Sequence, residues 1–480
     1  MPLAPVQMQM WFLDQLAPGS PAYHIVRGLR LTGELDADLL ARSVADVVRR
    51  HEILRTAYIY ADGAPWQVVM PDPDGLLEFE DLSGLPAGEV EDVIQARAVA
   101  AALRPFDFTS GRLARFCLFK RDAAAHVLVV TMHHICVDGV SVPVVFGEIA
   151  EFYQAHRAGK PARLPEVAVQ FADCVLWQLE RMRTEAFRRH LAYWEKQLAD
   201  LPLLELPTDR PRPPAPTYRG GRATLDLPPE VVSGVRALAD DAGVTLLIVL
   251  VAAFAATMHR YTGQDEIVVG TATTGRNAPA LAGVVGCFIN TLVLRIDTSG
   301  DPSFAELIRR TRDVVFGAWE HREVPFESVV AVVAPERERS RNPLYQVWIQ
   351  LVDGASADID LPVDGILAED YEIAMAITPL DLSLNVIDRG AGLAFRVEFA
   401  ADLFDRSRVE RLLGHLERVL RAVAADAGVR VSGLPLLGEE ELELVSRVWQ
   451  GADAVQPGGP VHGQIGVRAA ADPGAVAGGA

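Results

Sequence analysis

The chain has 480 residues, of which 50% are hydrophobic and 23% are charged, a globular composition that excludes a mainly disordered protein. Its 45 basic and 64 acidic side chains leave a formal net charge of −19, so we expect no nucleic-acid partner. The 4 cysteines include no CxxC pair, which argues against a disulfide framework or a zinc module and favours a reducing cytoplasm.

The first third of the chain alternates helix-like and strand-like patterns. The opening segment MPLAPVQMQMWFLDQL has no basic region before its apolar residues, so we do not expect a signal peptide. Residues 38–50 place their apolar side chains at helical spacing. Residues 127–132 form a short β-branched run that predicts a buried strand, and residues 142–153 return to helical spacing.

A proline-rich passage over residues 201–216 predicts an extended linker, and beyond it the alternation resumes. The expected elements are a helix at 244–258, a strand at 267–271, a helix at 304–319, a strand at 345–351, a hairpin at 382–399 with a glycine-containing turn, and a helix at 406–424. This pattern favours an α/β or α+β fold with two comparable lobes. From residue 456 onward Gly, Ala and Pro dominate, which is typical of a frayed or truncated tail.

The most apolar long stretch, Ala242 to Met258, is slightly short of a membrane-spanning helix. It is flanked by ordinary amphipathic sequence. We therefore interpret it as a buried core helix and expect no membrane association.

One cluster carries candidate chemistry, the segment His133-His134-Ile135-Cys136-Val137-Asp138-Gly139 between the predicted strand and the next helix. Adjacent side chains on extended backbone point to opposite sides, so only one histidine can face a given substrate. For the same reason the pair converges poorly on a metal ion, and we expect no metal. A pair of structural histidines and a general base with a pKa near neutrality both remain open. Gly139 predicts a backbone angle that other residues resist.

The HHxxxDG pattern of this segment resembles the signature of the condensation domains of nonribosomal peptide synthetases, which are relatives of chloramphenicol acetyltransferase. Further segments resemble the family's other motifs in the family's order, from Pro5 to about Leu437. They are Gln7 with Trp11, Phe12 and Leu13; Arg50 to Thr56; Phe171 to Trp177; Val285 to Thr291 with Arg295; Val324 to Glu327; and Ser340 to Leu344.

The resemblance implies two chloramphenicol-acetyltransferase-like lobes in a V-shaped pseudo-dimer with a central tunnel. We place the first lobe at residues 1–178, the second at 179–437, and a linker with the truncated start of an adenylation domain at 438–480. A donor peptidyl carrier protein upstream and an acceptor peptidyl carrier protein downstream would deliver substrates on phosphopantetheine arms. The domain itself would be monomeric, would bind no cofactor, and would adjoin an adenylation domain.

In that family the acceptor's amine attacks the donor thioester, so the residue we expect to manage the proton or orient the amine is the second histidine, His134. The resemblance implies that His133, Asp138 and Gly139 hold the loop and that Asp138 pairs with Arg295. Possible tunnel residues are Ser141, Asn290 and Cys136.

Two side-chain assignments allow a plainer interpretation. Cys136, near His134, is either a nucleophile or a small buried hydrophobe, and aminolysis of a thioester needs no enzyme nucleophile, which favours packing. The aromatic side chains of the motifs are interpreted as core anchors rather than substrate contacts; they are Trp11, Phe12, Trp177 and Phe288.

The leading functional hypothesis is amide formation between two carrier-bound substrates. Ester-forming and N-acylating condensation domains are alternatives within the same fold. A cyclization domain would replace the histidines by aspartates, and an epimerization domain fits the other motifs less well. A non-catalytic docking module is the alternative from another class, and the retention of both histidines argues against it.

Overall fold

The computed structural model describes residues 1–71, 75–333, 340–354, 361–448 and 470–471. The chain divides into two compact units, Met1–Leu434 and Pro435–Ala480. The second unit contains a short helix, α13 (Glu439–Glu443), followed by a π-helical turn over Leu444–Val448. The predicted adenylation-like segment, residues 461–476, lies almost wholly outside the described residues.

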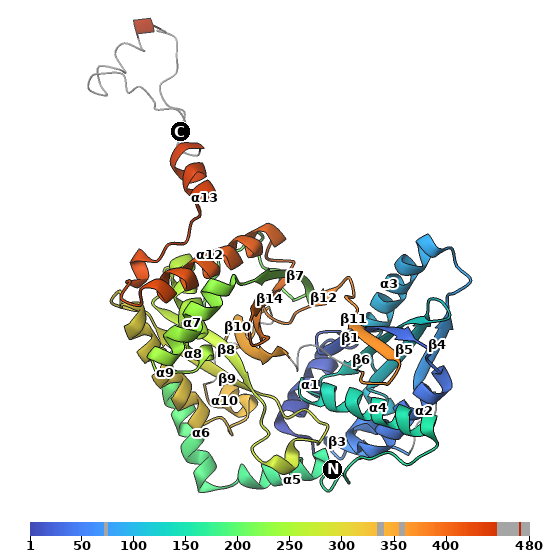
Figure 1. The fold of residues 1–480 in the computed structure, drawn as a ribbon. Helices are drawn as coiled ribbons and strands as arrows, with labels where there is room; N and C mark the ends of the chain where they lie inside the picture. Colours follow the sequence, from blue (N-terminus) through green and yellow to red (C-terminus); the bar gives the residue numbers. More distant parts are fainter. Residues whose placement is uncertain (72–74, 334–339, 355–360, 449–469, 472–480) are drawn as a thin grey trace. The chain divides into compact units, whose positions relative to one another are not determined.

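An N-terminal sheet of five strands organises the first part of the large unit, in the order β11-β1-β6-β5-β4 (Figure 1). Its strands are β1 (His24–Gly33), β4 (Leu77–Asp81), β5 (Ala114–Lys120), β6 (Ala125–His133) and β11 (Ile366–Asp370). The accompanying helices are α1 (Pro5–Leu16), α2 (Ala37–Arg50), α3 (Ala87–Leu103) and α4 (Ser141–Ala158), with short 3-10 helices at Glu52–Arg55 and Phe108–Ser110 and a hairpin formed by β2 (Thr56–Ala61) and β3 (Ala64–Val69).

Both faces of this sheet are buried, which explains the unbroken apolar run in the sequence of β6. Leu128 and Val130 pack into the core shared with α2 and α4, whereas Val127 and Val129 pack on the opposite side in the core shared with α3. The alternation follows from the two-residue period of a strand. The predicted helix at 38–50 and the predicted strand at 127–132 are confirmed.

A C-terminal sheet of seven strands organises the rest of the unit, in the order β12-β7-β14-β13-β10-β8-β9. Its strands are β7 (Arg219–Asp226), β8 (Glu266–Thr273), β9 (Asn290–Asp297), β10 (Val347–Asp353), β12 (Ala376–Ile377), β13 (Leu382–Asp388) and β14 (Leu393–Ala400). The helices in this part are α7 (Pro229–Asp241), α8 (Leu246–Thr262), α9 (Phe304–Glu320), α10 (Phe326–Val333) and α12 (Arg406–Ala425), with 3-10 helices at Pro279–Leu281 and Val431–Gly433.

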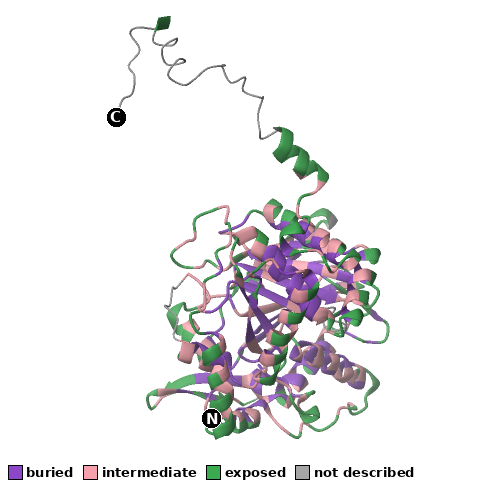
Figure 2. Ribbon diagram, turned by 90° about the vertical axis from the view of Figure 1, so that its left-hand side faces the viewer, coloured by how far each residue is buried: buried purple, intermediate pink, exposed green. Residues whose placement is uncertain are grey.

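The predicted hairpin at 382–399 is confirmed as the antiparallel pair β13 and β14, and Gly390 in its turn has a φ of 74°. Helix α8 contains the most apolar stretch and is almost entirely buried, as expected for a core helix. Figure 2 shows buried residues concentrated on the strands, with exposed residues on the outer sides of the helices. No single helix of the described residues meets the length and apolarity needed to cross a membrane; the bent pair α7 and α8 does so by length and composition.

Two helices, α5 (Phe171–Arg181) and α6 (Glu185–Gln197), follow α4 along the chain. The proline-rich passage at 201–216 contains no helix or strand, as predicted. It does not hang free as a linker, however, because Arg212 forms an ion pair with Asp381 and the backbone N–H of Asp209 donates to the carbonyl oxygen of Leu403.

Strand β11 shows that the two sheets are not built from two separate stretches of chain. It comes from residues 366–370, yet it pairs antiparallel with β1 at the edge of the N-terminal sheet. The backbone N–H of Tyr371 continues this pairing by donating to the carbonyl oxygen of Gly28 at 2.9 Å. The division into lobes at residues 178 and 179 stays a prediction. Under that division β11 would belong to the second lobe, although it pairs with a strand of the first lobe.

Substitution of Gly28 tests the crossing strand. A Cβ at position 28 would lie 2.4 Å from the carbonyl oxygen of Tyr371, so Gly28→Ala should displace β11 and lower the free energy of unfolding by about 1–3 kcal/mol. Amide hydrogen exchange at Tyr371 should accelerate. Gly88→Ala on α3 is the control, because its Cβ meets no described atom within 4 Å; equal protection of Tyr371 in both variants would contradict this role for Gly28.

Candidate active site

The end of β6 places the two histidines on opposite sides of the strand, as predicted. The backbone N–H of His133 donates to the carbonyl oxygen of Leu113, and that of His134 donates to the carbonyl oxygen of Tyr23, each at 2.8 Å. The strand end is therefore held from both flanks. The side chain of His133 is buried, and that of His134 is half-buried.

His133 has a structural environment. Its Nδ1 accepts a hydrogen bond from the backbone N–H of Ile135 at 3.0 Å, and its ring packs edge-on against Phe108 with the centroids 4.8 Å apart. Burial lowers the pKa of His133 well below its usual value. A neutral ring with Nδ1 as acceptor keeps the loop closed against the core, in agreement with the loop-holding role that we expected.

Asp138 is the centre of a buried hydrogen-bond network. Its carboxylate accepts hydrogen bonds from the backbone N–H of Ser141 at 2.8 Å, the backbone N–H of Phe288 at 3.0 Å and the guanidinium of Arg276 at 3.1 Å. Only 2% of Asp138 and 6% of the Arg276 side chain are exposed. A buried carboxylate needs this number of donors to offset its lost hydration.

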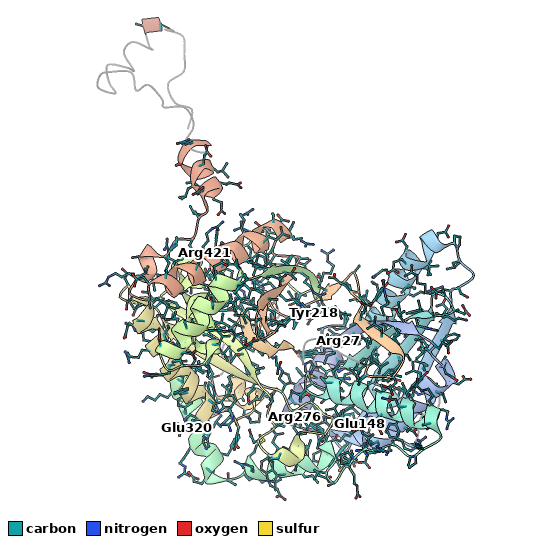
Figure 3. The ribbon with its side chains drawn as sticks, viewed as in Figure 1. Arg27, Glu148, Tyr218, Arg276, Glu320 and Arg421 are labelled. Carbon is teal, nitrogen blue, oxygen red and sulfur yellow. The ribbon has the colours of Figure 1, made fainter. Side chains whose placement is uncertain are left out.

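This ion pair joins two segments that are far apart in the sequence. Asp138 lies on the loop that carries His134, whereas Arg276 lies on the loop between β8 and β9, here called the β8–β9 loop (residues 274–289) (Figure 3). Arg276 also donates to the carbonyl oxygens of Leu281 and Val284, each at 2.6 Å, and lies over the ring of Phe288. It therefore holds its own loop in shape and binds that loop to the histidine segment.

The predicted pairing of Asp138 with Arg295 is wrong. Arg295 lies on β9 opposite Val268, where its guanidinium donates to both carboxylate oxygens of Glu266 at 2.9 Å and to the carbonyl oxygen of Ala199. A strand residue cannot leave its sheet to reach the histidine loop, whereas a loop residue can. The sequence feature that could have pointed to Arg276 is its position just after the predicted strand at 267–271, where a loop begins.

Two of the predicted tunnel residues are buried structural groups. The hydroxyl of Ser141 lies 2.7 Å from Asp138 Oδ1 and 2.9 Å from the carbonyl oxygen of Gly286, so it takes part in the same network. Cys136 is fully buried, its Sγ lies 3.1 Å from the carbonyl oxygen of His133, and burial raises its pKa to about 12. Neither residue lines the cavity described below, so their assignment to a tunnel stays a prediction, and Cys136 packs as a small buried hydrophobe.

Gly139 does not have the conformation that we expected. Its φ is not in the left-handed region, and an added Cβ would meet no described atom within 4 Å. The residue is exposed. Backbone strain therefore does not require glycine at this position.

A cavity of about 500 Å³ approaches His134 through one residue of its wall, and His134 itself is not among the lining residues. Cys287 on the β8–β9 loop lines this cavity, and its Sγ lies 3.7 Å from Nδ1 of His134. Much of the remaining wall is apolar and aromatic, including Phe171, Trp177 and Phe288. Trp177 and Phe12 are each about half exposed, so the prediction that they anchor the core is wrong.

Asn290 lines the cavity, as the tunnel prediction required, but its amide is occupied by the backbone. Its Nδ2 donates to the carbonyl oxygens of Arg322 and Val324 at 2.8 and 2.7 Å, and its Oδ1 accepts from the N–H of Phe326 at 3.0 Å. These bonds fix the turn that begins α10. Asn290 is therefore a residue that shapes the cavity wall.

The motif at Arg50 to Thr56 supports the site from behind. The carboxylate of Glu148 on α4 (Figure 3) accepts a hydrogen bond from Arg50 Nε at 3.1 Å. Its other oxygen lies 2.7 Å from Nε2 of the buried His51. These contacts tie the end of α2 to the helix that follows the histidine loop. The motif thus has a structural role.

The electrostatics favour a neutral His134. Burial lowers the pKa of His134, and the Asp138 carboxylate opposes this shift. A neutral imidazole can accept a proton or a hydrogen bond from an attacking group. Among the residues that the structure describes, no three His, Cys, Asp or Glu side chains converge as metal ligands.

Removal of Arg276 tests the buried ion pair. Arg276→Gln should lower the free energy of unfolding by about 3–5 kcal/mol, because it leaves the Asp138 charge buried without its partner. Arg295→Gln is the matched control, and loss of its partly exposed pair with Glu266 should cost about 0–1 kcal/mol. Urea denaturation measures both; equal losses would show that Asp138 does not depend on Arg276.

Two glycine substitutions test the loop contacts. Gly139→Ala should leave the free energy of unfolding within about 0.5 kcal/mol of the parent, because the Cβ enters open space. In Gly286→Ala the Cβ would lie 2.1 Å from the Phe171 ring, and we expect a loss of about 1–3 kcal/mol. Thermal unfolding checks both, and a strongly destabilised Gly139→Ala would restore the backbone explanation.

Comparison with known proteins places this site in a family. Residues 1–445 match the model of a family described as Condensation domain. A linear gramicidin synthase of Brevibacillus parabrevis is 38% identical over 450 residues, which cover 93% of this chain and 9% of that protein. Phosphinothricin tripeptide synthetase PhsB of Streptomyces viridochromogenes is 38% identical over 464 residues, covering 96% of this chain and 39% of that protein. The chain thus spans well under two thirds of these relatives.

Solved structures share the fold over most of the chain. The X-domain from teicoplanin biosynthesis matches with a TM-score of 0.83 and 29% identity, covering 91% of this chain and 97% of that one. The first condensation domain of the calcium-dependent antibiotic synthetase, in complex with a substrate analogue, has a TM-score of 0.74 and 22% identity and covers 91% of this chain and 98% of that one. With the family match and the HHxxxDG site on one loop, the chain belongs to the condensation-domain family of nonribosomal peptide synthetases.

Proposed function

We propose that this chain catalyses amide formation by transferring a donor acyl or peptidyl group from one carrier protein to the amine of an aminoacyl group on another. The observation that carries the proposal is the half-buried His134 next to Cys287 of the cavity wall, on a loop held by the Asp138–Arg276 ion pair. The amine attacks the thioester carbonyl, the C–N bond forms, the C–S bond breaks, and the donor arm leaves as a thiol.

The thioester is already activated, so the enzyme's contribution is to position two tethered substrates and to manage one proton. His134 would accept that proton, or a hydrogen bond from the amine, at an imidazole nitrogen. Cys136 and Cys287 take no covalent part, because burial raises the pKa of both thiols. The substrates would arrive on phosphopantetheine arms of a donor and an acceptor carrier protein, so the domain itself would need no cofactor.

A single-turnover assay tests this function. Donor and acceptor carrier proteins loaded with a panel of aminoacyl groups are mixed with the chain, and intact-protein mass spectrometry follows transfer of donor mass to the acceptor. His134→Ala should slow transfer by about 10²–10⁴-fold. Transfer at the parent rate in the variant would contradict a role for His134 in the chemistry. His259→Ala, at a partly exposed histidine of α8 that does not line the cavity, is the control for loss of a histidine elsewhere.

The pH dependence of transfer follows from the lowered pKa of His134. The reactive form is the neutral imidazole, so the rate should fall on acidification through a pKa below the usual histidine value of about 6.5. Because His134 is already neutral between about pH 6.5 and 7.5, its titration should not change the rate in that range. An acid limb centred above 6.5 would show that His134 is not the group that titrates.

A non-catalytic docking module is the second candidate, and one comparison favours it. The X-domain from teicoplanin biosynthesis, with a TM-score of 0.82 and 29% identity, has been solved in complex with OxyB. In this alternative the same fold would present a carrier-bound peptide to another enzyme. Binding of carrier proteins without transfer for any member of the panel would favour the docking function.

A further inference from the structure

One carboxylate on the cavity wall has no role in the network described above. Glu327 lies in the first turn of α10, where the three hydrogen bonds of Asn290 fix the backbone just before it. Its side chain lines the cavity. Asn290 thus holds the backbone that carries Glu327.

One of the two carboxylate oxygens of the half-buried Glu327 has no hydrogen-bond partner among the described residues. Its Oε2 atom is buried and accepts no hydrogen bond from any described residue. Burial raises the pKa of Glu327 to about 7. A buried polar atom without a hydrogen-bond partner lowers the stability of the folded chain. A bound ligand that supplies the missing donor would explain such an atom.

Three groups that interact electrostatically with Glu327 come from three different segments. They are Tyr23 before β1, Cys287 on the β8–β9 loop and Tyr345 before β10. Burial raises the pKa of each, which keeps all three neutral near pH 7. The charged and titratable side chains elsewhere on the cavity wall are Asp173, Cys174, Arg181, His190, Arg322 and Glu323, of which Arg181 and Glu323 pair with each other.

Glu327 and His134 share one neighbour. Cys287 is the link, because it lines the cavity, lies 3.7 Å from Nδ1 of His134 and interacts electrostatically with Glu327. An ammonium group has three N–H donors and a positive charge, and one of these donors would satisfy the unpartnered Oε2 atom of Glu327.

We propose that Glu327 binds the amino group of the attacking aminoacyl substrate, with its Oε2 atom accepting a hydrogen bond from that nitrogen. This inference rests on the proposed function and names a second residue of the same site. Glu327 would orient the amine, and His134 would remain the group that manages the reaction proton. Asn290 is the positioning residue behind Glu327.

Binding of two matched probes tests the inference without requiring turnover. The first is alanyl-aminopantetheine, in which an amide replaces the thioester, and the second is its lactyl counterpart, in which a hydroxyl replaces the amine. Ligand-observed NMR measures both dissociation constants. Glu327→Gln should weaken the alanyl probe by about tenfold, as expected for loss of a charge-assisted hydrogen bond, and should leave the lactyl probe unchanged.

Glu323→Gln is the matched control, because it makes the same chemical change on the same cavity at a carboxylate that already pairs with Arg181. It should leave the preference for the alanyl probe intact. Equal effects of the two substitutions, equal loss of both probes in Glu327→Gln, or failure of the parent chain to bind the alanyl probe would each overturn the assignment.

The pH dependence of probe binding gives a second readout. Glu327 is neutral below about pH 7 and a carboxylate above it, so the affinity for the alanyl probe should rise as the pH increases from 6 to 7.5 while the probe stays protonated. The rise should be absent in Glu327→Gln. A rise of the same size in that variant would assign it to another group and overturn the inference.

The transfer assay separates this inference from the proposed function. Transfer by the parent chain with unaltered probe binding in Glu327→Gln would overturn the role of Glu327 and leave the condensation activity standing. Selective loss of alanyl-probe binding in Glu327→Gln, with no transfer by the parent chain for any substrate, would support Glu327 as an amine-binding residue and contradict the activity.

Discussion

The buried ion pair between Asp138 and Arg276 is the interaction on which the rest of the site depends. A carboxylate with 2% exposure is stable only if donors replace its water, and here they come from Ser141, Phe288 and Arg276. Two of these three donors belong to the β8–β9 loop. Folding of the histidine loop therefore requires that this distant loop be in place.

The two histidines of this loop have different surroundings. His133 uses its Nδ1 within its own loop and its ring against the core, so it contributes rigidity. His134 stays half-buried beside Cys287 and keeps a lowered pKa, so it is the histidine left available to a reacting group. Under the proposed function, rigid placement matters more than acid strength, because a thioester and an amine react once they are held together in a suitable geometry.

On the cavity wall, too, hydrogen bonds fix the backbone next to a side chain with a proposed function. Asn290 uses its amide to fix the turn before α10, and in the first turn of that helix the Oε2 atom of Glu327 has no hydrogen-bond partner among the described residues. The same scaffold suits a docking module as well as an enzyme, since both need a shaped cavity. What distinguishes them is the chemistry of His134 and the groups around it.

Local sequence was sufficient for the elements and for the histidine loop. The strand at 127–132, the helix at 38–50, the hairpin at 382–399 and the spacing of His134 and Asp138 depend on side-chain periodicity and on residues a few positions apart, and all were predicted. The tertiary structure alone decided that Arg276 rather than Arg295 meets Asp138, that Ser141 joins the buried network, that β11 crosses to the N-terminal sheet, and that Glu327 reaches the cavity. Each of these depends on which distant loops meet. Pairing across 138 residues is set by the packing of whole sheets, and no local pattern encodes it.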